Sequence, residues 1–569
     1  MTEEEKLREA MVRYRKHYEY LLETIPLPVV SEPGEQETYM LPSSDGVRLE
    51  TWLFFPKNIT EPVSLIAVRS CYPNQEELLR EKAVAFNRRG FGFAIQWCRG
   101  THGSEGDWVP NIHERDDGLS FMNFLQKDQR IRNIGYWGDS YLAMTGWCMA
   151  DEVPSKVRAM CLGVYGCFRH VSAYKDGLFR QDILTAWAMD NAGKPVTADY
   201  MKSAAYRPQV HVDEDLWGIR LDWYRDWITH TDADDPYWKE GFWGMLQEIP
   251  AKIRIPLYVR DGWYDHHLGS ALCTWDALSK EAKSKSTLEI GPWNHYSAVC
   301  VEHQKTSSLD DNSVSGPALW FDRILRKGEE PKENIRLYEI GADQTEQYTD
   351  FPVPSDRTEV FYLNADDASE KHKLSTENTA QKKSVSYEYD PEHPVLSHGC
   401  ESTFRSSKEN GSLIQAPIND RSDVISFVSD ELKTPLHING KICITLYVSS
   451  DAEDTAFTGK LMEIFEDGTA VNIRGTITTL AYRNDTQHRG SYTPGEVVPI
   501  TLRMWDIDWL VQKGSRLRLD ISSSDFPEYS IHVNQKGIWS VQTKSLIAKQ
   551  TIYTGGNTQS RIELPIIDC

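Results

Sequence analysis

A serine on a sharp turn between a predicted strand and a predicted helix constrains this chain most. Residues 132–146 read RNIGYWGDSYLAMTG: a short apolar run leads into Gly138-Asp139-Ser140, and small and apolar residues typical of a buried helix follow. Gly138 keeps the crowded side of such a turn free of a side chain, and the turn exposes the serine hydroxyl above the strand end. Ala143 stands where a second small residue, usually glycine, is expected. The alternative is an ordinary turn in which Ser140 only caps the helix.

Predicted strands alternate with predicted helices on both sides of this turn. Before and just after it, the patterns predict strands at 48–56, 63–68, 91–97 and 159–164, with helices at 76–89, 114–126 and from Ser140 to about Ala150. The alternation resumes with a strand at 255–260, a helix at 269–280, a strand at 286–290 and a helix at 313–326. This order predicts the α/β class, with a mostly parallel sheet covered by helices on both faces.

The remaining segments do not follow this alternation of strands and helices. Between residues 167 and 250, six tryptophans occur among helical patterns, which predicts a helical cap over the strand ends; the alternative is a further helical layer of the core. After Gly328, short alternating runs are separated by turn residues, which predicts an all-β sandwich or jelly roll. Residues 3–24 have helical apolar spacing and predict an amphipathic helix packed on the body or on a second subunit.

These segments define five predicted units. They are an N-terminal helical extension (1–36), the first part of an α/β-hydrolase domain (37–166), a helical cap (167–250), the second part of the α/β-hydrolase domain (251–335) and a C-terminal β jelly-roll domain (336–569).

The charge balance argues against two classes of partner. The chain carries 84 Asp and Glu against 62 Lys and Arg, a net charge of −22, whereas nucleic acids and anionic membranes are bound by basic surfaces. No stretch approaches the roughly 18 apolar residues of a membrane span, and the acidic first residues lack the apolar core of a signal peptide. The ten cysteines have no C-x-x-C spacing, which predicts reduced thiols in a cytoplasmic protein. The N-terminal helix and the β-domain are compatible with a homodimer.

Two later loops supply the groups that a serine nucleophile needs. A serine hydroxyl becomes nucleophilic when a base removes its proton, and a third group must orient that base. In an α/β-hydrolase sheet, the acid and the histidine follow the serine on loops after later strands. Asp265 follows the strand at 255–260, and His295 follows the next strand, 30 residues further on. The same segment leaves alternatives open, namely Asp261 as the acid and His266 or His267 as the base.

The tetrahedral intermediate of acyl transfer needs two donors for its oxyanion. One is the backbone N–H of Tyr141, at the start of the helix after Ser140. The second predicted donor is the phenol of Tyr72, after the strand at 63–68; the alternative is a packing aromatic before a proline. Four further residues are predicted to bind substrate: Trp137, Asp139, Trp263 and Trp293. No cofactor is implied, and the Asp265-His266-His267 run lacks the spacing of a metal site.

Several motifs together resemble one family. They are VRSCY (68–72), CRGTHGSEG (98–106), GDSYL (138–142), GWYD (262–265), GPWNH (291–295), LWFDRIL (319–325), SSDAEDT (449–455) and SSSDFP (522–527). This set, from about residue 40 to residue 540, resembles the X-Pro dipeptidyl-peptidase-like serine hydrolases. That group includes cocaine esterase, α-amino acid ester hydrolases and glutaryl-cephalosporin acylases.

The resemblance implies an α/β-hydrolase domain, a helical cap and a non-catalytic jelly roll. By matching motif it implies Ser140 as the nucleophile, Asp265 as the acid, His295 as the base and Tyr72 as the oxyanion tyrosine. Ala143 departs from the family's glycine, and Asp139 departs from the apolar or small residue that often precedes the serine. An ionised carboxylate at 139, if close to the nucleophile, would disfavour anionic acyl groups and favour a cationic one.

We therefore expect an enzyme, a serine esterase or acylase that hydrolyses an ester or amide of a small molecule through an acyl-Ser140 intermediate. One alternative is an X-Pro dipeptidyl-peptidase, which would need carboxylates in the cap to bind the α-ammonium group of a peptide. The cap offers Asp213, Glu214, Asp215, Asp234 and Asp235. The other alternative is a carbohydrate-binding protein in which the hydrolase half is inactive.

Overall fold

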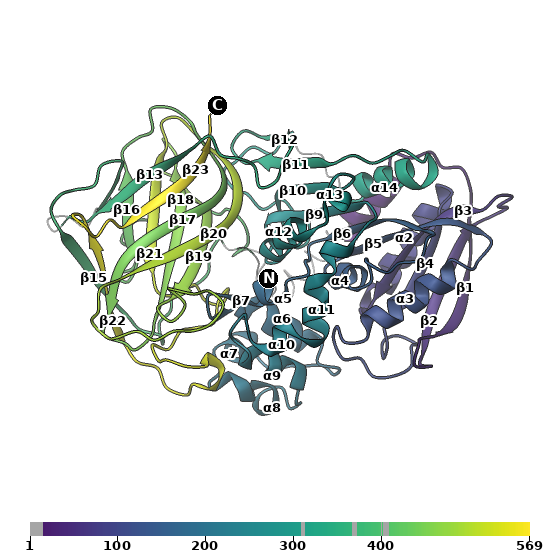
Figure 1. The fold of residues 1–569 in the computed structure, drawn as a ribbon, viewed down its shortest axis with the longest axis horizontal. Coiled ribbons are helices and arrows are strands. Elements are labelled where there is room, and N and C mark those ends of the chain that lie inside the picture. The colour runs from purple at the N-terminus through teal and green to yellow at the C-terminus, as the bar shows by residue number, and fades with distance from the viewer. Residues whose placement is uncertain (1–14, 309–312, 367–371, 400, 402–408, 569) are drawn as a thin grey trace.

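A computed structural model describes residues 15–308, 313–366, 372–399, 401 and 409–568 (Figure 1). The predicted N-terminal helix is described from residue 15, and residues 15–23 are helical. Leu21 and Leu22 are buried, and the guanidinium of Arg15 pairs with Glu77 and Glu81 of the neighbouring helix α2. The helix therefore packs on the body of the protein, while residues 1–14 of the prediction lie outside the described residues.

The first half of the chain forms a mixed ten-stranded sheet, and the predicted α/β class is confirmed. Its order is β1-β2-β4-β3-β5-β6-β9-β10-β11-β12. The strands from β4 to β11 pair in parallel, and antiparallel pairs occur only toward the two edges. The bounds are β1 Pro33–Pro42, β2 Arg48–Pro56, β3 Val63–Ser70, β4 Gly92–Trp97, β5 Ile131–Asp139, β6 Val157–Gly163, β9 Leu257–Tyr264, β10 Thr287–Asn294, β11 Asn334–Glu339 and β12 Gln344–Tyr348.

Two details of this sheet differ from the sequence prediction. Strands β9 and β10 run four residues further than expected, to Tyr264 and Asn294, so the predicted acid and base each follow a strand directly. Strand β11 pairs with β10 and β12 pairs with β11, so the hydrolase sheet extends past the predicted boundary at residue 335. The sequence of a short alternating strand does not show which sheet the strand joins, because alternation indicates only which of its faces is buried.

Helices cover both faces of this sheet (Figure 1). They are α2 Glu76–Arg88, α3 Glu114–Leu125, α4 Tyr141–Trp147, α12 Leu268–Ala277, α13 Lys280–Lys283 and α14 Ser315–Phe321, which continues as a π-helical turn over Asp322–Arg326. Helix α4 ends at Trp147, three residues before the predicted end. All seven of its residues are buried, as expected for a helix that packs against the middle of a sheet.

Short helices form a cap between β6 and β9, at the bottom of the view in Figure 1. They are α5 Arg169–Ala173, α6 Gln181–Asp190, α7 Tyr200–Ala204, α8 Val212–Asp215, α9 Asp222–Thr229, α10 Pro236–Lys239 and α11 Gly241–Glu248, with a small hairpin of β7 Tyr174–Lys175 and β8 Leu178–Phe179. Trp187, Trp223 and Trp227 form one aromatic cluster, with ring centroids 4.8 to 5.8 Å apart. The cap segment is therefore helical and rich in packed aromatic rings, and Trp187 also stacks on Tyr141 of α4 at 6.0 Å.

The last third is an all-β domain (Figure 1, left). Its strands are β13 Arg357–Asn364, β14 His372–Ser375, β15 Lys383–Tyr389, β16 Ile425–Ser429, β17 Leu436–Ser450, β18 Ala456–Ile464, β19 Ala470–Thr479, β20 Val498–Val511, β21 Arg516–Ser522, β22 Ala548–Thr554 and β23 Arg561–Ile567. Backbone hydrogen bonds join Ile340, just after β11, to Asp508 and Leu510 of β20. The two large sheets are thus connected through main-chain contacts.

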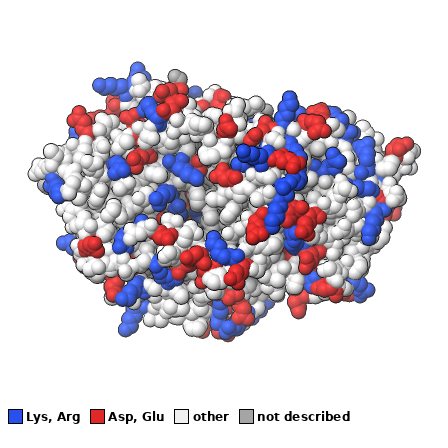
Figure 2. Space-filling view, viewed as in Figure 1, with Lys and Arg blue, Asp and Glu red and all other residues white. Residues whose placement is uncertain are grey.

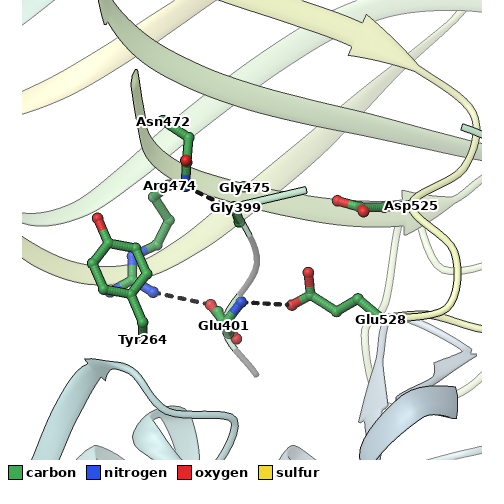
Figure 3. A pocket seen from close by; sticks show the side chains of 8 residues that line it. All are labelled: Tyr264, Gly399, Glu401, Asn472, Arg474, Gly475, Asp525 and Glu528. Atoms are coloured by element: carbon green, nitrogen blue, oxygen red, sulfur yellow. Dashed lines mark hydrogen bonds and ion pairs between the residues drawn. The ribbon is translucent and has the colours of Figure 1, made fainter. Parts of the chain in front are cut away.

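A buried ionic network links the β-domain, the cap and the hydrolase sheet, and Figure 3 shows its Arg474–Glu401 pair. Glu401 accepts from Arg180 of the cap at 2.6 Å and from Arg474 of β19 at 3.0 Å. Arg474 also donates to the carbonyl oxygen of Trp263 in β9 at 2.6 Å. These residues line or border a small cavity with Tyr264, Asp525 and Glu528. A β-domain side chain thereby holds the backbone of the strand that precedes Asp265.

Replacing Arg474 by methionine is expected to destabilise the protein by about 3–5 kcal/mol, the usual cost of breaking a buried ion pair from one side. Methionine keeps the apolar stem but leaves the Trp263 carbonyl without its guanidinium donor. The change should lower the urea midpoint of unfolding. Arg503→Met is the control, since Arg503 is exposed on β20 and should shift stability by less than about 0.5 kcal/mol. Equal midpoints for the two variants would contradict the proposed strength of the network.

The described helices include none that is long and apolar enough to cross a membrane. On the face shown in Figure 2, basic and acidic side chains are interspersed.

Candidate active site

The turn at Ser140 has the strained backbone of a nucleophile elbow. Ser140 sits between β5 and α4 with φ of 58°, a conformation that non-glycine residues rarely adopt. A Cβ on Gly138 would lie 2.1 Å from the carbonyl oxygen of Leu142, so only glycine fits there. Ala143 is fully buried, and its N–H donates to the Ser140 carbonyl at 2.9 Å. The alanine that departs from the usual glycine is therefore accommodated in the first turn of α4.

Three loops bring a hydroxyl, an imidazole and a carboxylate together. The Nε2 atom of His295 lies 2.9 Å from the Oγ of Ser140. Its Nδ1 atom lies 2.6 Å from Oδ2 of Asp265. The three residues follow β5, β10 and β9 at the carboxyl ends of parallel strands, which is the edge where α/β sheets build their sites. The predicted order of the three groups thus corresponds to a connected chain of hydrogen bonds.

Asp265 is held in one orientation. It is fully buried, and its Oδ1 accepts from the backbone N–H of His267 at 2.5 Å. Its own N–H and C=O bond to Gly262 and Leu268 in the turn. Because one carboxylate oxygen is fixed by the backbone, the other is directed at His295, and the imidazole is kept in a single orientation.

The geometry discriminates among the alternatives left open by the sequence. Asp261 is fully buried, and burial, with the neighbouring Asp265 charge, raises its carboxyl pKa well above the ordinary value. Burial lowers the pKa of both His266 and His267 well below the ordinary value. His267 Nδ1 bonds Ser172 at 2.7 Å, and His266 Nδ1 is buried without a hydrogen-bond partner. Among these candidates, His295 and Asp265 are the pair that bonds in series with Ser140.

Side chains of Asp265, His266 and His295 also offer donor atoms within 4.8 Å of one another, a grouping that could hold a metal ion. The sequence spacing did not indicate it, because the third donor comes from a different loop. Two of these residues are engaged in the hydrogen bonds of the triad. The expectation of no metal therefore stays a prediction.

Two groups remain the predicted donors to an oxyanion. Tyr141 is the first residue of α4, so the helix cannot use its backbone N–H. The Tyr141 phenol is anchored away from the reacting atoms: it donates to Glu114 at 2.9 Å and accepts from the N–H of Asn111 at 2.8 Å. Tyr72 is held differently. Its Oη accepts from Nε1 of Trp187 at 3.0 Å, and burial raises the pKa of its phenol well above the ordinary value.

The hydrogen bond from Trp187 gives the cap a role at the predicted oxyanion donor. It occupies an acceptor position of the Tyr72 oxygen and does not use the phenolic proton. A donor on one side of a hydroxyl also strengthens the bond that the hydroxyl donates. Sequence reasoning placed Trp187 among the cap tryptophans without this role, since no local pattern shows which indole N–H meets a phenol 115 residues earlier.

Replacing Trp187 by phenylalanine is expected to lower kcat about tenfold, because it removes this donor but keeps an aromatic ring. Tyr72→Phe should lower kcat by about 10²–10³, the cost of losing one oxyanion donor. In the Tyr72→Phe background, Trp187→Phe should add little, since the hydroxyl it orients is gone. Steady-state kinetics on a p-nitrophenyl ester measure all three, and fully additive losses would contradict the coupling.

Three predicted substrate-binding tryptophans lie in the core instead. Trp137 packs against Phe86 and Phe321 with Lys82 Nζ 3.2 Å from its ring centroid, and Trp263 donates to the Tyr338 carbonyl at 2.8 Å. Trp293 is 4% exposed and lies under the guanidinium of Arg260. They lie one or two residues before the carboxyl ends of β5, β9 and β10, and all three are buried. For these three the predicted role is replaced by a packing role.

Asp139 is exposed, and its role in substrate binding stays a prediction. Its carboxylate lies against Gly163, and its charge acts on Lys82, whose pKa burial lowers to about 8 while Asp139 raises it. The charges of Lys82 and Asp139 therefore partly offset each other beside the turn at Ser140.

Comparisons with known proteins agree with this architecture. A model of the X-Pro dipeptidyl-peptidase (S15 family) matches residues 45–297, and a model of the X-Pro dipeptidyl-peptidase C-terminal non-catalytic domain matches residues 328–563. The chain belongs to the X-Pro dipeptidyl-peptidase family. Like other members, it is a serine hydrolase of the α/β-hydrolase type.

Similar proteins carry several named activities. Cocaine esterase of Rhodococcus sp. (strain MB1 Bresler) is 27% identical, over 93% of this chain and 98% of its own. The solved structure of an aminopeptidase from a marine sediment archaeon, Thaumarchaeota archaeon, has a TM-score of 0.81 at 18% identity, over 94% of this chain and 96% of its own. An α-amino acid ester hydrolase structure has a TM-score of 0.79 at 19% identity, over 94% and 97%. At these identities the two structures show the fold alone.

Proposed function

We propose that this protein hydrolyses a carboxylic ester or amide of a small molecule through a covalent acyl-Ser140 intermediate. The observation that carries the proposal is the hydrogen-bonded series from Ser140 Oγ through His295 to Asp265, at 2.9 and 2.6 Å. Nucleophile, base and orienting acid within bonding distance are what acyl transfer requires.

Each group has a defined part in the two half-reactions. His295 Nε2 takes the Ser140 proton as Oγ attacks the carbonyl carbon, and Asp265 stabilises the imidazolium that forms. His295 then gives this proton to the leaving oxygen or nitrogen, and the acyl-serine ester remains. A water molecule enters, loses a proton to His295 and attacks the ester, and return of that proton to Ser140 releases the acid.

The oxyanion of both tetrahedral intermediates would be bound by the Tyr141 N–H and the Tyr72 hydroxyl. The raised pKa of the buried Tyr72 phenol supports this role, since a phenol that stays protonated can donate. The position of Tyr141 at the start of α4 supplies the second donor. Preorganised donors of this kind usually provide a large part of the rate enhancement.

An ester or acyl substrate is favoured over an X-Pro peptide by the state of the cap carboxylates. Asp213 and Glu214 are both paired with Arg225 at 2.7 Å, and Asp215 accepts from the Tyr206 hydroxyl at 2.6 Å. Asp234 lies 3.2 Å from His488, and Asp235 caps α10 and pairs with His230. The predicted α-ammonium ligands thus have structural partners already.

A fluorophosphonate probe tests the proposal directly. Labelling should occur at Ser140 in the folded protein and disappear on heat denaturation, as required by an activated serine. Parallel assays with p-nitrophenyl butyrate and Ala-Pro-p-nitroanilide separate the two substrate classes, and the ester should be turned over faster. Absence of labelling would contradict the proposal and favour the alternative of an inactive carbohydrate-binding protein. Faster turnover of the anilide would favour the X-Pro dipeptidyl-peptidase.

A further inference from the structure

Arg169, the first residue of α5, is a buried cation without a counter-ion among the described residues. Its side chain is 6% exposed. The guanidinium lies over the rings of Trp227 and Trp243, 4.5 and 5.9 Å from their centroids. Its Nε atom is buried without a hydrogen-bond partner. No ion pair joins it to any described carboxylate.

This environment sets Arg169 apart from the other buried arginines in the described part of the chain. Arg89 donates to the backbone carbonyls of Glu23 and Ala85. Each of the remaining six pairs with a carboxylate: Arg69 with Glu114, Arg99 with Asp117, Arg180 and Arg474 with Glu401, Arg260 with Glu289 and Arg518 with Asp520.

An unpaired buried guanidinium calls for an anion. Arginine remains charged throughout the accessible pH range, and removing a charge from water is unfavourable unless a partner compensates it. Contact with aromatic faces offsets part of this cost. Although the chain has a net charge of −22, no described carboxylate pairs with this guanidinium, which makes Arg169 a candidate partner for a bound anion.

The position of Arg169 points to the substrate as that partner. It follows β6, which lies between the strands of the nucleophile and the acid in the sheet order β5-β6-β9. Trp227 beneath it has its ring 5.8 Å from Trp187, which donates to Tyr72. Tyr165 shares a side-chain hydrogen bond with Arg169, and its phenol has a pKa raised by burial and lowered by the Arg169 charge. The Tyr165 ring is 4.4 Å from that of His267.

We propose that Arg169 binds a carboxylate of the substrate, so that the enzyme acts on esters or amides that carry a negative charge near the scissile bond. This deepens the proposed function and rests on it. The planar guanidinium matches a carboxylate through two parallel hydrogen bonds. His266 and His267 are poorer partners for a carboxylate, because burial lowers the pKa of both and disfavours their charged forms. Nearby Arg180 is already neutralised by Glu401 and Glu528.

The proposal reverses the expectation drawn from Asp139 in the sequence. The charge of Asp139 is partly offset by Lys82, whereas the charge of Arg169 is not offset by any described group. A substrate group bound at Arg169 would therefore be an anion and not the α-ammonium group of a peptide.

Matched pairs of substrates test this assignment and locate the carboxylate. The first pair is mono(4-nitrophenyl) glutarate and its methyl ester, which place a charge or a neutral group on the acyl side. The second pair is 4-(butanoyloxy)benzoate and its methyl ester, which do the same on the leaving side. Each is assayed with the full-length protein and with Arg169→Gln, Arg169→Lys and, as a matched control, Arg220→Gln, which removes an exposed cap arginine.

The wild type should prefer the charged member of at least one pair, and that pair identifies the side of the scissile bond. Arg169→Gln should lower kcat/KM for the charged member by about 30-fold or more, as expected when one partner of a buried charge pair is removed. The neutral member should change by less than about threefold. Arg169→Lys should retain part of the preference, and Arg220→Gln should retain all of it.

Preference of the wild type for the neutral member of both pairs would overturn the proposal, whether or not the variants fold. Equal losses for charged and neutral members in Arg169→Gln would also overturn it and leave Arg169 as a structural cation between two tryptophans. Turnover of the neutral esters separates this failure from that of the proposed function. If neutral esters are hydrolysed by a protein that fluorophosphonate inactivates at Ser140, the hydrolase assignment stands without the carboxylate site.

Discussion

Replacing Ser140 by alanine is expected to lower kcat for a p-nitrophenyl ester by about 10⁴–10⁶. Alanine removes the atom that forms the acyl-enzyme, and triad members act as a unit, so the loss of one costs nearly as much as the loss of all. The activity that remains would be the weak catalysis supplied by substrate binding and by the oxyanion donors. Steady-state assays at saturating ester, with protein purified free of contaminating esterases, measure the change.

The backbone of the elbow provides the control for this variant. Ser140 has φ of 58°, and alanine at such a position stays strained much as serine does, so the fold should be retained. Far-UV circular dichroism and the thermal midpoint should match the parent within about 3 °C. Activity equal to the parent in a folded Ser140→Ala protein would remove the covalent mechanism and with it both proposals made above.

Replacing Asp265 by asparagine is expected to lower kcat about 10⁴-fold near neutral pH, with the shape of the site preserved. The amide cannot stabilise the imidazolium, and its NH₂ group favours the tautomer in which His295 Nδ1 accepts and Nε2 carries the proton. In that tautomer His295 cannot accept the Ser140 proton. The rate should recover partly at high pH, where hydroxide replaces the base, and a pH–rate profile records this change.

Asp261→Asn is the matched control, since it makes the same chemical change four residues earlier on β9. Burial and the Asp265 charge raise the pKa of Asp261 well above its ordinary value. A raised pKa favours the neutral carboxyl group, which resembles an amide, so this variant should lose less than about tenfold. If Asp261→Asn lost as much as Asp265→Asn, the assignment of the acid would be wrong.

Side chains from the sheet, the cap and the β-domain all contact the proposed catalytic groups or the strands that carry them. The hydrolase sheet supplies the triad, and the cap supplies the Trp187 donor to Tyr72 at 3.0 Å. The β-domain supplies Arg474, which holds the Trp263 carbonyl of the acid-bearing strand at 2.6 Å. A domain described as non-catalytic in its family model thus contacts the backbone two residues before the predicted acid.

The sequence predicted those site residues whose positions follow from local patterns. A glycine-framed serine between an apolar strand and a small-residue helix predicts an elbow because backbone geometry, not distant contacts, fixes that turn. Asp265 and His295 could be chosen because parallel strands bring their carboxyl ends to one edge, in a chain order that the alternation of elements already shows. The same regularity predicted the order of units from the sheet to the β-domain.

Tertiary structure alone decided which polar groups meet. Nothing in the sequence shows that Trp137, Trp263 and Trp293 are buried in the sheet layers while Trp187 reaches Tyr72, since all are aromatic residues in apolar surroundings. Arg169 reads like any of the buried arginines, and its lack of a described counter-ion appears only once every neighbour is placed. Local patterns encode periodicity and backbone preference, whereas hydrogen bonds and ion pairs depend on distances of a few ångströms between residues remote in the chain.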